Sequence, residues 1–238
     1  MVGAVRLSVG DVFAGDFEVR QLLGQGGMGA VYAVVDRTCG EERALKVLLP
    51  ELIADESTRR RFAQEGRIGE QLDSPHVPRT YRVGIDPATG MPWIAMELLR
   101  GRDLRALVSE RGAPSLEEAR AILEQLGEAL SAAHARGLVH RDLKPENVFL
   151  EERGGARRVK LLDFGVAKVI DLNRTSALGT AAIGSPLWMA PEQATAGGRI
   201  APATDVYAFG LIAFYVLTGR VFWRSAHGRP ASPGSCAR

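Results

Sequence analysis

The hydrophobic pattern changes its period close to residue 100, and this change limits the chain to two unlike halves. Before that point, apolar and branched side chains form short runs that are typical of strands. These runs are Phe17–Leu23, Val31–Val35, Arg43–Leu48, Thr80–Ile85 and Trp93–Leu98. After Gly101 the apolar residues recur every three or four positions, which is typical of helices. The sequence therefore predicts an α+β chain with a β-rich first lobe and a mainly helical second lobe, joined near Leu98–Gly101.

Three segments carry helix signals. The first is about Asp55–Leu72, whose apolar residues lie toward one side. Ser115 and Glu118 form a capping box that starts the second helix, and Gly137 is placed at its C-cap. Thr204–Leu217 is apolar almost all round, so it is predicted to be a buried helix. Two short strands complete the second lobe, at Val148–Leu150 and Val159–Leu162.

Composition excludes several classes of protein. Lys+Arg 30 against Asp+Glu 28 leaves a net charge of +2, so no overall charge favours nucleic acid or an anionic membrane. Cys39 and Cys236 are too far apart for a zinc motif or a disulfide framework, and they fit a reducing cytosol. The apolar run Val206–Leu217 is shorter than the ~20 residues of a membrane span. We expect a cytoplasmic chain without a membrane segment.

Three features of the first lobe carry weak signals on their own. Gly24-x-Gly26-x-x-Gly29 joins two predicted strands, so it is either an ordinary tight hairpin or a loop whose backbone N–H groups approach phosphates. Lys46 lies in a predicted strand of a chain that has only four lysines, which suggests that a compact charge is needed there. Glu65 shares the inward side of the first helix and is a candidate partner for Lys46. A solvent-facing lysine and a surface glutamate are the plainer interpretations.

The most informative stretch is His140-Arg141-Asp142-Leu143-Lys144-Pro145-Glu146-Asn147. It places an acid, a lysine and an amide in a loop between a predicted helix and a predicted strand. Asp163-Phe164-Gly165 comes directly after an apolar strand, and Ala190-Pro191-Glu192 closes a loop-like segment. Each motif alone fits a polar turn, but their joint occurrence in this order makes that interpretation improbable.

In this order the motifs resemble those of the eukaryotic-like (Hanks-type) serine/threonine protein kinases. The sequence around Ala190-Pro191-Glu192-Gln193 is similar to that of bacterial members of the family. The resemblance covers about Phe17 to Phe222. It implies a bilobal protein-kinase-like fold. It also implies an enzyme that transfers the γ-phosphoryl group of ATP to serine and threonine hydroxyls of proteins.

The resemblance implies contacts with the nucleotide. The three loop glycines are expected over the phosphates, with Lys46, oriented by Glu65, on the α- and β-phosphates. Met96 is implied as the gatekeeper, and the backbone of Glu97 and Leu99 is expected to bind the adenine. The apolar walls of the adenine site are assigned to Val31, Ala44 and Phe149.

Further roles follow from the same resemblance. Asp142 is the implied catalytic base, and Lys144 is expected to steady the γ-phosphate. Asp163 and Asn147 are expected to bind Mg²⁺, with Mn²⁺ as an alternative ion.

Regulation is also implied by the resemblance. Arg141 is expected to bind a phosphate on the segment between Asp163 and Glu192, placed there by autophosphorylation. Thr175 and Thr180 are the leading phosphosite candidates and Ser176 is the next, whereas Ser185 is assigned a structural or substrate-contact role.

The resemblance stops after Phe222, so we expect a C-terminal lobe without its last helices. Glu192 is then expected to lack the arginine partner that family members supply. The expected organisation is an extension at 1–16, an N-lobe at 17–97, a C-lobe at 98–223 and a low-complexity tail at 224–238. A kinase homodimer is a candidate assembly.

Two other functions compete with the active kinase. The first is an inactive kinase-like module that binds a nucleotide or a partner. The second is an NAD-dependent dehydrogenase, and the strand predicted directly after the glycine loop argues against it.

Overall fold

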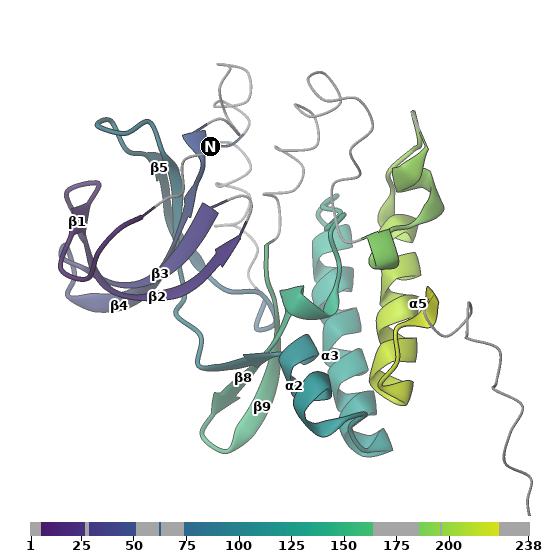
Figure 1. Cartoon of the computed structure of the whole chain (residues 1–238). Helices are drawn as coiled ribbons and strands as arrows, with labels where there is room; N and C mark the ends of the chain where they lie inside the picture. The colour runs from purple at the N-terminus through teal and green to yellow at the C-terminus, as the bar shows by residue number, and fades with distance from the viewer. Residues whose placement is uncertain are drawn as a thin grey trace, which may run out of the picture.

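Among the described elements, strands β1 to β7 precede helices α2, α3 and α5, and strands β8 and β9 lie between α3 and α5 in the chain (Figure 1). The computed structural model describes residues 6–26, 29–50, 62, 74–163, 186–195 and 197–223. The N-lobe is an antiparallel sheet of six strands in the order β1-β2-β3-β4-β6-β5. Its strands are β1 (Val12–Phe13), β2 (Phe17–Gly26), β3 (Gly29–Asp36), β4 (Glu41–Leu48), β5 (Thr80–Ile85) and β6 (Pro92–Met96).

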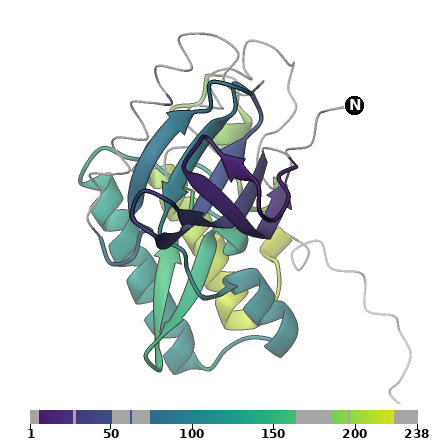
Figure 2. The same cartoon turned by 90° about the vertical axis from the view of Figure 1, so that its left-hand side faces the viewer.

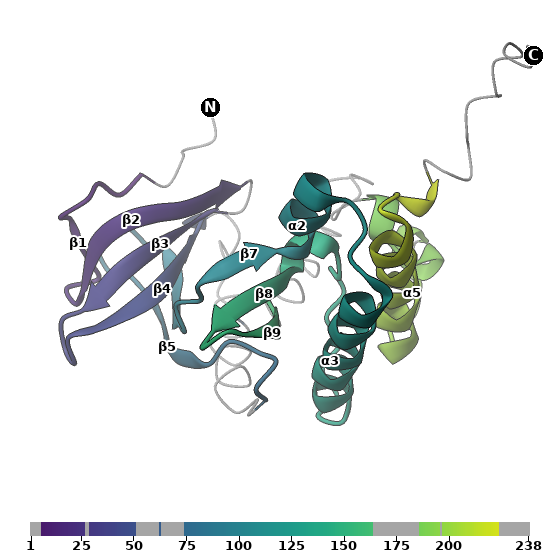
Figure 3. The same ribbon diagram turned by 90° about the horizontal axis from the view of Figure 1, so that it is seen from below.

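The C-lobe combines helices with a small antiparallel sheet, in the strand order β7-β8-β9. Seen from below, this sheet lies between the N-lobe and the helices (Figure 3). Helix α3 packs against both β9 and α5. The bounds are β7 (Gly101–Asp103), β8 (Val148–Arg153), β9 (Ala156–Leu161), α2 (Leu104–Arg111), α3 (Leu116–His134) and α5 (Pro202–Thr218). Three 3₁₀ turns are η2 (Pro145–Asn147), η3 (Pro186–Trp188) and η4 (Pro191–Ala194). The predicted bilobal α+β fold is confirmed.

The core of the N-lobe follows from alternation along its strands. In β3 every second residue is buried, from Ala30 through Tyr32 and Val34, because successive side chains point to opposite faces. Across the core, Phe17 and Trp93 make an edge-on ring contact with centroids 4.9 Å apart. Figure 2 looks onto this lobe and shows the strands curling around that interior.

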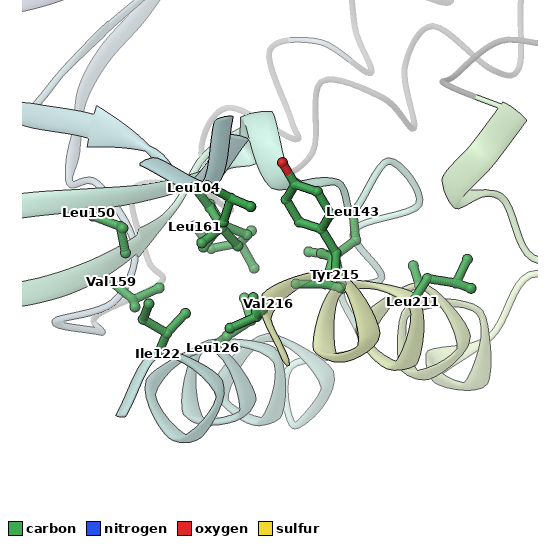
Figure 4. Packing of buried hydrophobic residues seen from close by; sticks show 14 of the residues in the cluster. Leu104, Ile122, Leu126, Leu143, Leu150, Val159, Leu161, Leu211, Tyr215 and Val216 are labelled. Atoms are coloured by element: carbon green, nitrogen blue, oxygen red, sulfur yellow. The ribbon is translucent and has the colours of Figure 1, made fainter. Parts of the chain in front are cut away.

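The core of the C-lobe lies where α3 and α5 meet the small sheet (Figure 4). Ile122 and Leu126 of α3 are buried there, and Val216 reaches the same cluster from α5. Leu143, in the middle of the motif-bearing loop, is also buried in it. That anchor ties the polar residues on either side of Leu143 to the most rigid part of the lobe.

Some predicted element ends were wrong. Strand β6 begins at Pro92 and ends at Met96 rather than Leu98, because Glu97 leaves the ladder and donates its N–H to the carbonyl of Arg79 at 2.9 Å. Helix α3 ends at His134 with Ala135 as its C-cap. Gly137 lies in the following turn with φ +71° and bonds back to the carbonyl of His134.

The capping box at the start of α3 is only half formed. The Ser115 hydroxyl accepts from the N–H of Glu118 at 3.2 Å, but the Glu118 carboxylate binds Arg157 instead. The elements β1, β7 and α2 were not predicted, since each is short or lacks a clear apolar period. Of the predicted helix 55–72, the structure describes only Phe62, which is helical and buried. No helix within the described ranges is long and apolar enough to cross a membrane.

Candidate active site

The loop between α3 and β8 brings three predicted site residues together. The Lys144 ammonium lies 2.7 Å from Oδ2 of Asp142. Asn147 donates from Nδ2 to the Asp142 carbonyl at 2.7 Å and lies 3.3 Å from its Oδ2. The η2 turn at Pro145–Asn147 folds the chain back so that these side chains converge. The Asp142 carboxylate is therefore held by a cation and an amide, and its side chain keeps a quarter of its surface in contact with solvent.

Asp205, in the first turn of α5, binds the backbone N–H groups at the start of this loop. Its carboxylate is fully buried and accepts from the N–H of His140 at 2.8 Å and from that of Arg141 at 2.9 Å. Nε2 of His134 lies 2.7 Å from the same carboxylate. A buried carboxylate needs such partners, and charge-assisted bonds of this kind are strong. Sequence reasoning gave Asp205 no role, although an acid inside an almost wholly apolar helix is a signal of one.

His140 connects the loop to the strand that ends beside Asp163. Its Nε2 lies 2.7 Å from the carbonyl of Leu162, and the N–H of Leu162 donates to the carbonyl of Asn147 at 2.8 Å. Asp163 follows directly and has a φ of +65°, which is uncommon for a residue other than glycine. The structure thus holds Asp163 in a strained backbone next to the Asp142 loop.

Lys46 and Asp163 form an ion pair across the two lobes. The distance from Nζ to Oδ1 is 2.5 Å, and the residues are 117 positions apart in sequence. Loss of hydration would raise the pKa of the Asp163 carboxyl, but the charge and hydrogen bond of Lys46, helped by His140 and Lys144, keep that pKa below its ordinary value. Sequence reasoning did not predict this pair. Glu65, the partner it gave to Lys46, lies outside the described residues.

Three residues assigned to the adenine site, Val31, Ala44 and Met96, share one face of the N-lobe sheet with Lys46. Val31 lies opposite Lys46, and Ala44 lies opposite Met96. Because Ala44 and Lys46 are two positions apart on β4, all four side chains point to the same side. This face carries the ammonium that reaches Asp163. The sheet therefore sets apolar side chains beside the charged pair.

The link between the lobes runs past these residues. Leu99 lies between β6 and β7, and the carboxylate of Glu97 binds the buried ammonium of Lys160 at 2.7 Å. Phe149, half-buried on β8, lies directly opposite Lys160. Lys160 was not predicted as a site residue, although a lysine inside the apolar run of β9, in a chain with four lysines, gave a signal.

Among the three described glycines of this loop, contacts with other described residues require a glycine at position 29 alone. A Cβ on Gly29, whose φ is +150°, would lie 2.0 Å from the carbonyl oxygen of Val47. Cβ atoms on Gly24 and Gly26 would meet nothing within 4 Å. Within the part of the chain that the structure describes, those two glycines leave space in front of the backbone, as the phosphate-approach interpretation requires.

The segment that begins at residue 186 contacts the loop at 140–147 and helix α5. The hydroxyl of Thr204 donates to Oε1 of Glu192 at 2.7 Å. Glu192 was expected to lack an arginine partner, and among the described residues its carboxylate binds this hydroxyl of α5. Gln193 donates from Nε2 to the Arg141 carbonyl at 2.6 Å, a contact that sequence reasoning missed. The phosphosite candidates Thr175, Ser176 and Thr180, and also Ser185, lie outside the described residues.

The donor set fits a hard cation that phosphates also bind. Asn147 uses its amide nitrogen for Asp142, which leaves its amide oxygen as the donor for a cation. Asp163 adds carboxylate oxygens from the neighbouring segment. Within the described ranges no three His, Cys, Asp or Glu side chains form a metal cluster. Such a sparse oxygen set suits magnesium, which one or two protein ligands and substrate phosphates commonly complete.

Comparisons with known proteins agree with this geometry. The sequence model of the protein kinase domain family matches residues 17–233. The serine/threonine-protein kinase PknA of Mycobacterium tuberculosis H37Rv is 36% identical over 215 residues, which are 89% of this chain and 49% of PknA. Pkn1 of Myxococcus xanthus, also named a serine/threonine-protein kinase, is 40% identical over 212 residues, which are 88% of this chain and 30% of Pkn1. The chain thus spans half or less of the length of these relatives.

A solved structure extends the agreement to the fold. The Mycobacterium tuberculosis PknI kinase domain matches with a TM-score of 0.73 and 33% identity, covering 91% of this chain and 79% of that one. With the motifs, the geometry and these matches in agreement, the chain belongs to the protein kinase domain family.

Proposed function

We propose that this chain is a serine/threonine protein kinase domain that transfers the γ-phosphoryl group of ATP to hydroxyl groups of protein substrates. The convergence of Lys144 and Asn147 on Asp142 carries the proposal, because it leaves one oriented carboxylate beside one cation. The pairing of Lys46 with Asp163 supports it from the opposite lobe. Phosphoryl transfer needs little besides positioning and charge neutralisation, and these five groups can supply both.

In this proposal each side chain acts on a stated part of the reaction. Asp142 accepts the proton of the substrate hydroxyl and orients it for attack. Lys144, which already lies on the Asp142 carboxylate, neutralises charge on the transferred phosphoryl group. Lys46 binds the phosphates that remain on the leaving nucleotide. Gly24 and Gly26 allow the loop backbone to approach those phosphates without a Cβ clash.

Asp163 and Asn147 would hold the magnesium ion through their oxygens. When bound, the ion neutralises the phosphate charge that develops in the transition state. Because the pKa of Asp163 is lowered by Lys46, its carboxylate stays charged throughout the neutral range and is ready as a ligand. The adenine would lie on the face that carries Val31, Ala44 and Met96, with the backbone of Glu97 and Leu99 at its edge and Phe149 opposite.

Regulation by phosphorylation is part of the proposal. Within the described ranges, the buried Nε of Arg141 has no hydrogen-bond partner, which supports Arg141 as the receptor of a phosphate on Thr175, Thr180 or Ser176. We further propose an N-lobe at 17–97 and a C-lobe at 98–223, flanked by 1–16 and 224–238. Family membership implies protein substrates; a cytoplasmic site of action and a kinase homodimer remain our proposals.

Intact-mass spectrometry after incubation with Mg-ATP and a protein substrate tests the function. The parent should transfer phosphate to the substrate and to itself, which the increase in mass of each protein records. Asp142→Asn should slow this transfer ~10²–10⁴-fold, which is the range for loss of a general base. Asp11→Asn, the same change in an exposed turn, should match the parent. A parent that folds but adds no phosphate would contradict the proposal and favour an inactive nucleotide-binding module. Peptide mapping of the same samples should find phosphate on Thr175, Thr180 or Ser176.

A further inference from the structure

The peptide that leads into Asp142 is held by side chains from two other segments. Arg141 has a φ of +70°, a region that residues other than glycine seldom adopt. Its N–H donates to Oδ1 of Asp205 at 2.9 Å. Its carbonyl, which belongs to the peptide bond with Asp142, accepts from Nε2 of Gln193 at 2.6 Å. A strained conformation persists only where its surroundings fix it, and here both polar groups of one residue are fixed.

Gln193 can make this contact in only one orientation. Its Oε1 accepts from the N–H of Ala190 at 3.0 Å, at the start of η4. Ala190 is fully buried, so the acceptor end of the amide is fixed to a rigid part of the backbone. The donor end then faces the Arg141 carbonyl, 52 positions away in sequence. An uncharged amide serves both ends, whereas a carboxylate could serve only the first.

We infer that Gln193 is a positioning residue for Asp142: its amide locks the Arg141–Asp142 peptide to the η4 turn and so fixes the direction of the Asp142 side chain. The inference rests on the proposed role of Asp142 as the base. Gln193 touches no reacting atom, so it acts on turnover rather than on nucleotide binding. Misplacement of a catalytic group by a fraction of an ångström lowers the rate without weakening the binding of substrate.

An isosteric pair of variants tests this role in the full chain. Gln193→Glu keeps the acceptor for Ala190 but loses the donor to Arg141. Gln125→Glu is the matched control, because Oε1 of Gln125 accepts from the N–H of Val159 at 2.9 Å and a carboxylate preserves that bond. We expect kcat of Gln193→Glu to fall about tenfold with KM for ATP within twofold. Tenfold equals ~1.4 kcal/mol, which is about the net contribution of one hydrogen bond. Gln125→Glu should match the parent in both constants.

Hydrogen–deuterium exchange gives a second readout that needs no activity. The backbone amides of residues 140–143 should exchange at least fivefold faster in Gln193→Glu than in the parent. In Gln125→Glu their exchange rates should equal those of the parent. If the parent transfers no phosphate, the proposed function fails. The exchange rates alone then test whether Gln193 fixes the Arg141–Asp142 peptide. A kcat within twofold of the parent, or unchanged exchange, overturns the inference. An equal loss of kcat in both variants also overturns it, because it would indicate a general structural effect.

Discussion

The hydroxyl of Thr204 offers a sharp test of how the segment containing Glu192 is fastened to the C-lobe. Thr204→Val keeps the shape of the side chain and removes its oxygen. The residue is 1% exposed, and its hydroxyl donates to Oε1 of Glu192 at 2.7 Å and accepts from the N–H of Ala201 at 3.3 Å. The substitution therefore removes one charge-assisted hydrogen bond and one long neutral one.

The expected loss of stability follows from these two contacts. A hydrogen bond to a charged group contributes ~1.5–3 kcal/mol, and the longer bond ~0.5 kcal/mol. The additional buried methyl group returns ~0.8 kcal/mol. Thr204→Val should thus lower the free energy of unfolding by about 1.2–2.7 kcal/mol, which in a domain of this size lowers Tm by about 2–11 °C.

Urea unfolding followed by circular dichroism measures this loss. The midpoint should fall while the slope m stays constant, because the folded and unfolded surfaces hardly change. Thr218→Val is the matched control on the same helix: its hydroxyl donates to the carbonyl of Phe214 at an exposed position, so its effect should stay within ~0.5 kcal/mol. A Thr204→Val protein as stable as Thr218→Val would refute the view that this hydroxyl fastens Glu192.

Two further predictions concern the nucleotide side of the site. Gly29→Ala should lower the free energy of unfolding by ~1–3 kcal/mol, because its Cβ would lie 2.0 Å from the carbonyl oxygen of Val47. Gly26→Ala should leave that free energy within ~1 kcal/mol of the parent and weaken ATP binding. Thermal melts with and without Mg-ATP separate the two effects. The pKa of Asp163 lies below its ordinary 3.8, so the stability gained from its pair with Lys46 is present above that value and is lost as pH falls through the lower folded-state pKa. The difference in free energy of unfolding between the parent and Asp163→Asn should stay constant from pH 8 to 5 and shrink below pH ~4. A difference that already shrinks near pH 6 would show that Lys46 does not lower the pKa of the Asp163 carboxyl.

The accuracy of the sequence predictions followed the range of the interactions behind them. Strand β5 was predicted to the residue, because alternation along a strand is a local property. The C-cap of α3 was wrong by two residues, since the turn at Gly137 looks in sequence like the end of the helix itself. The end of β6 was wrong because Glu97 is drawn out of the ladder by Arg79 and Lys160, which no pattern near Glu97 reveals.

The amino-acid sequence alone determined the family, the two unlike lobes and the chemical groups of the candidate site. These depend on residue types at short spacing, as in the stretch from His140 to Asn147. The tertiary structure alone decided which of those groups meet. Lys46 reaches Asp163 across 117 positions, Asp205 holds Arg141 across 64, and Gln193 binds the same residue across 52. Such contacts exist only because the fold brings distant segments of the chain together. A polar group that becomes buried there, such as the Asp205 carboxylate, must find a partner or destabilise the fold.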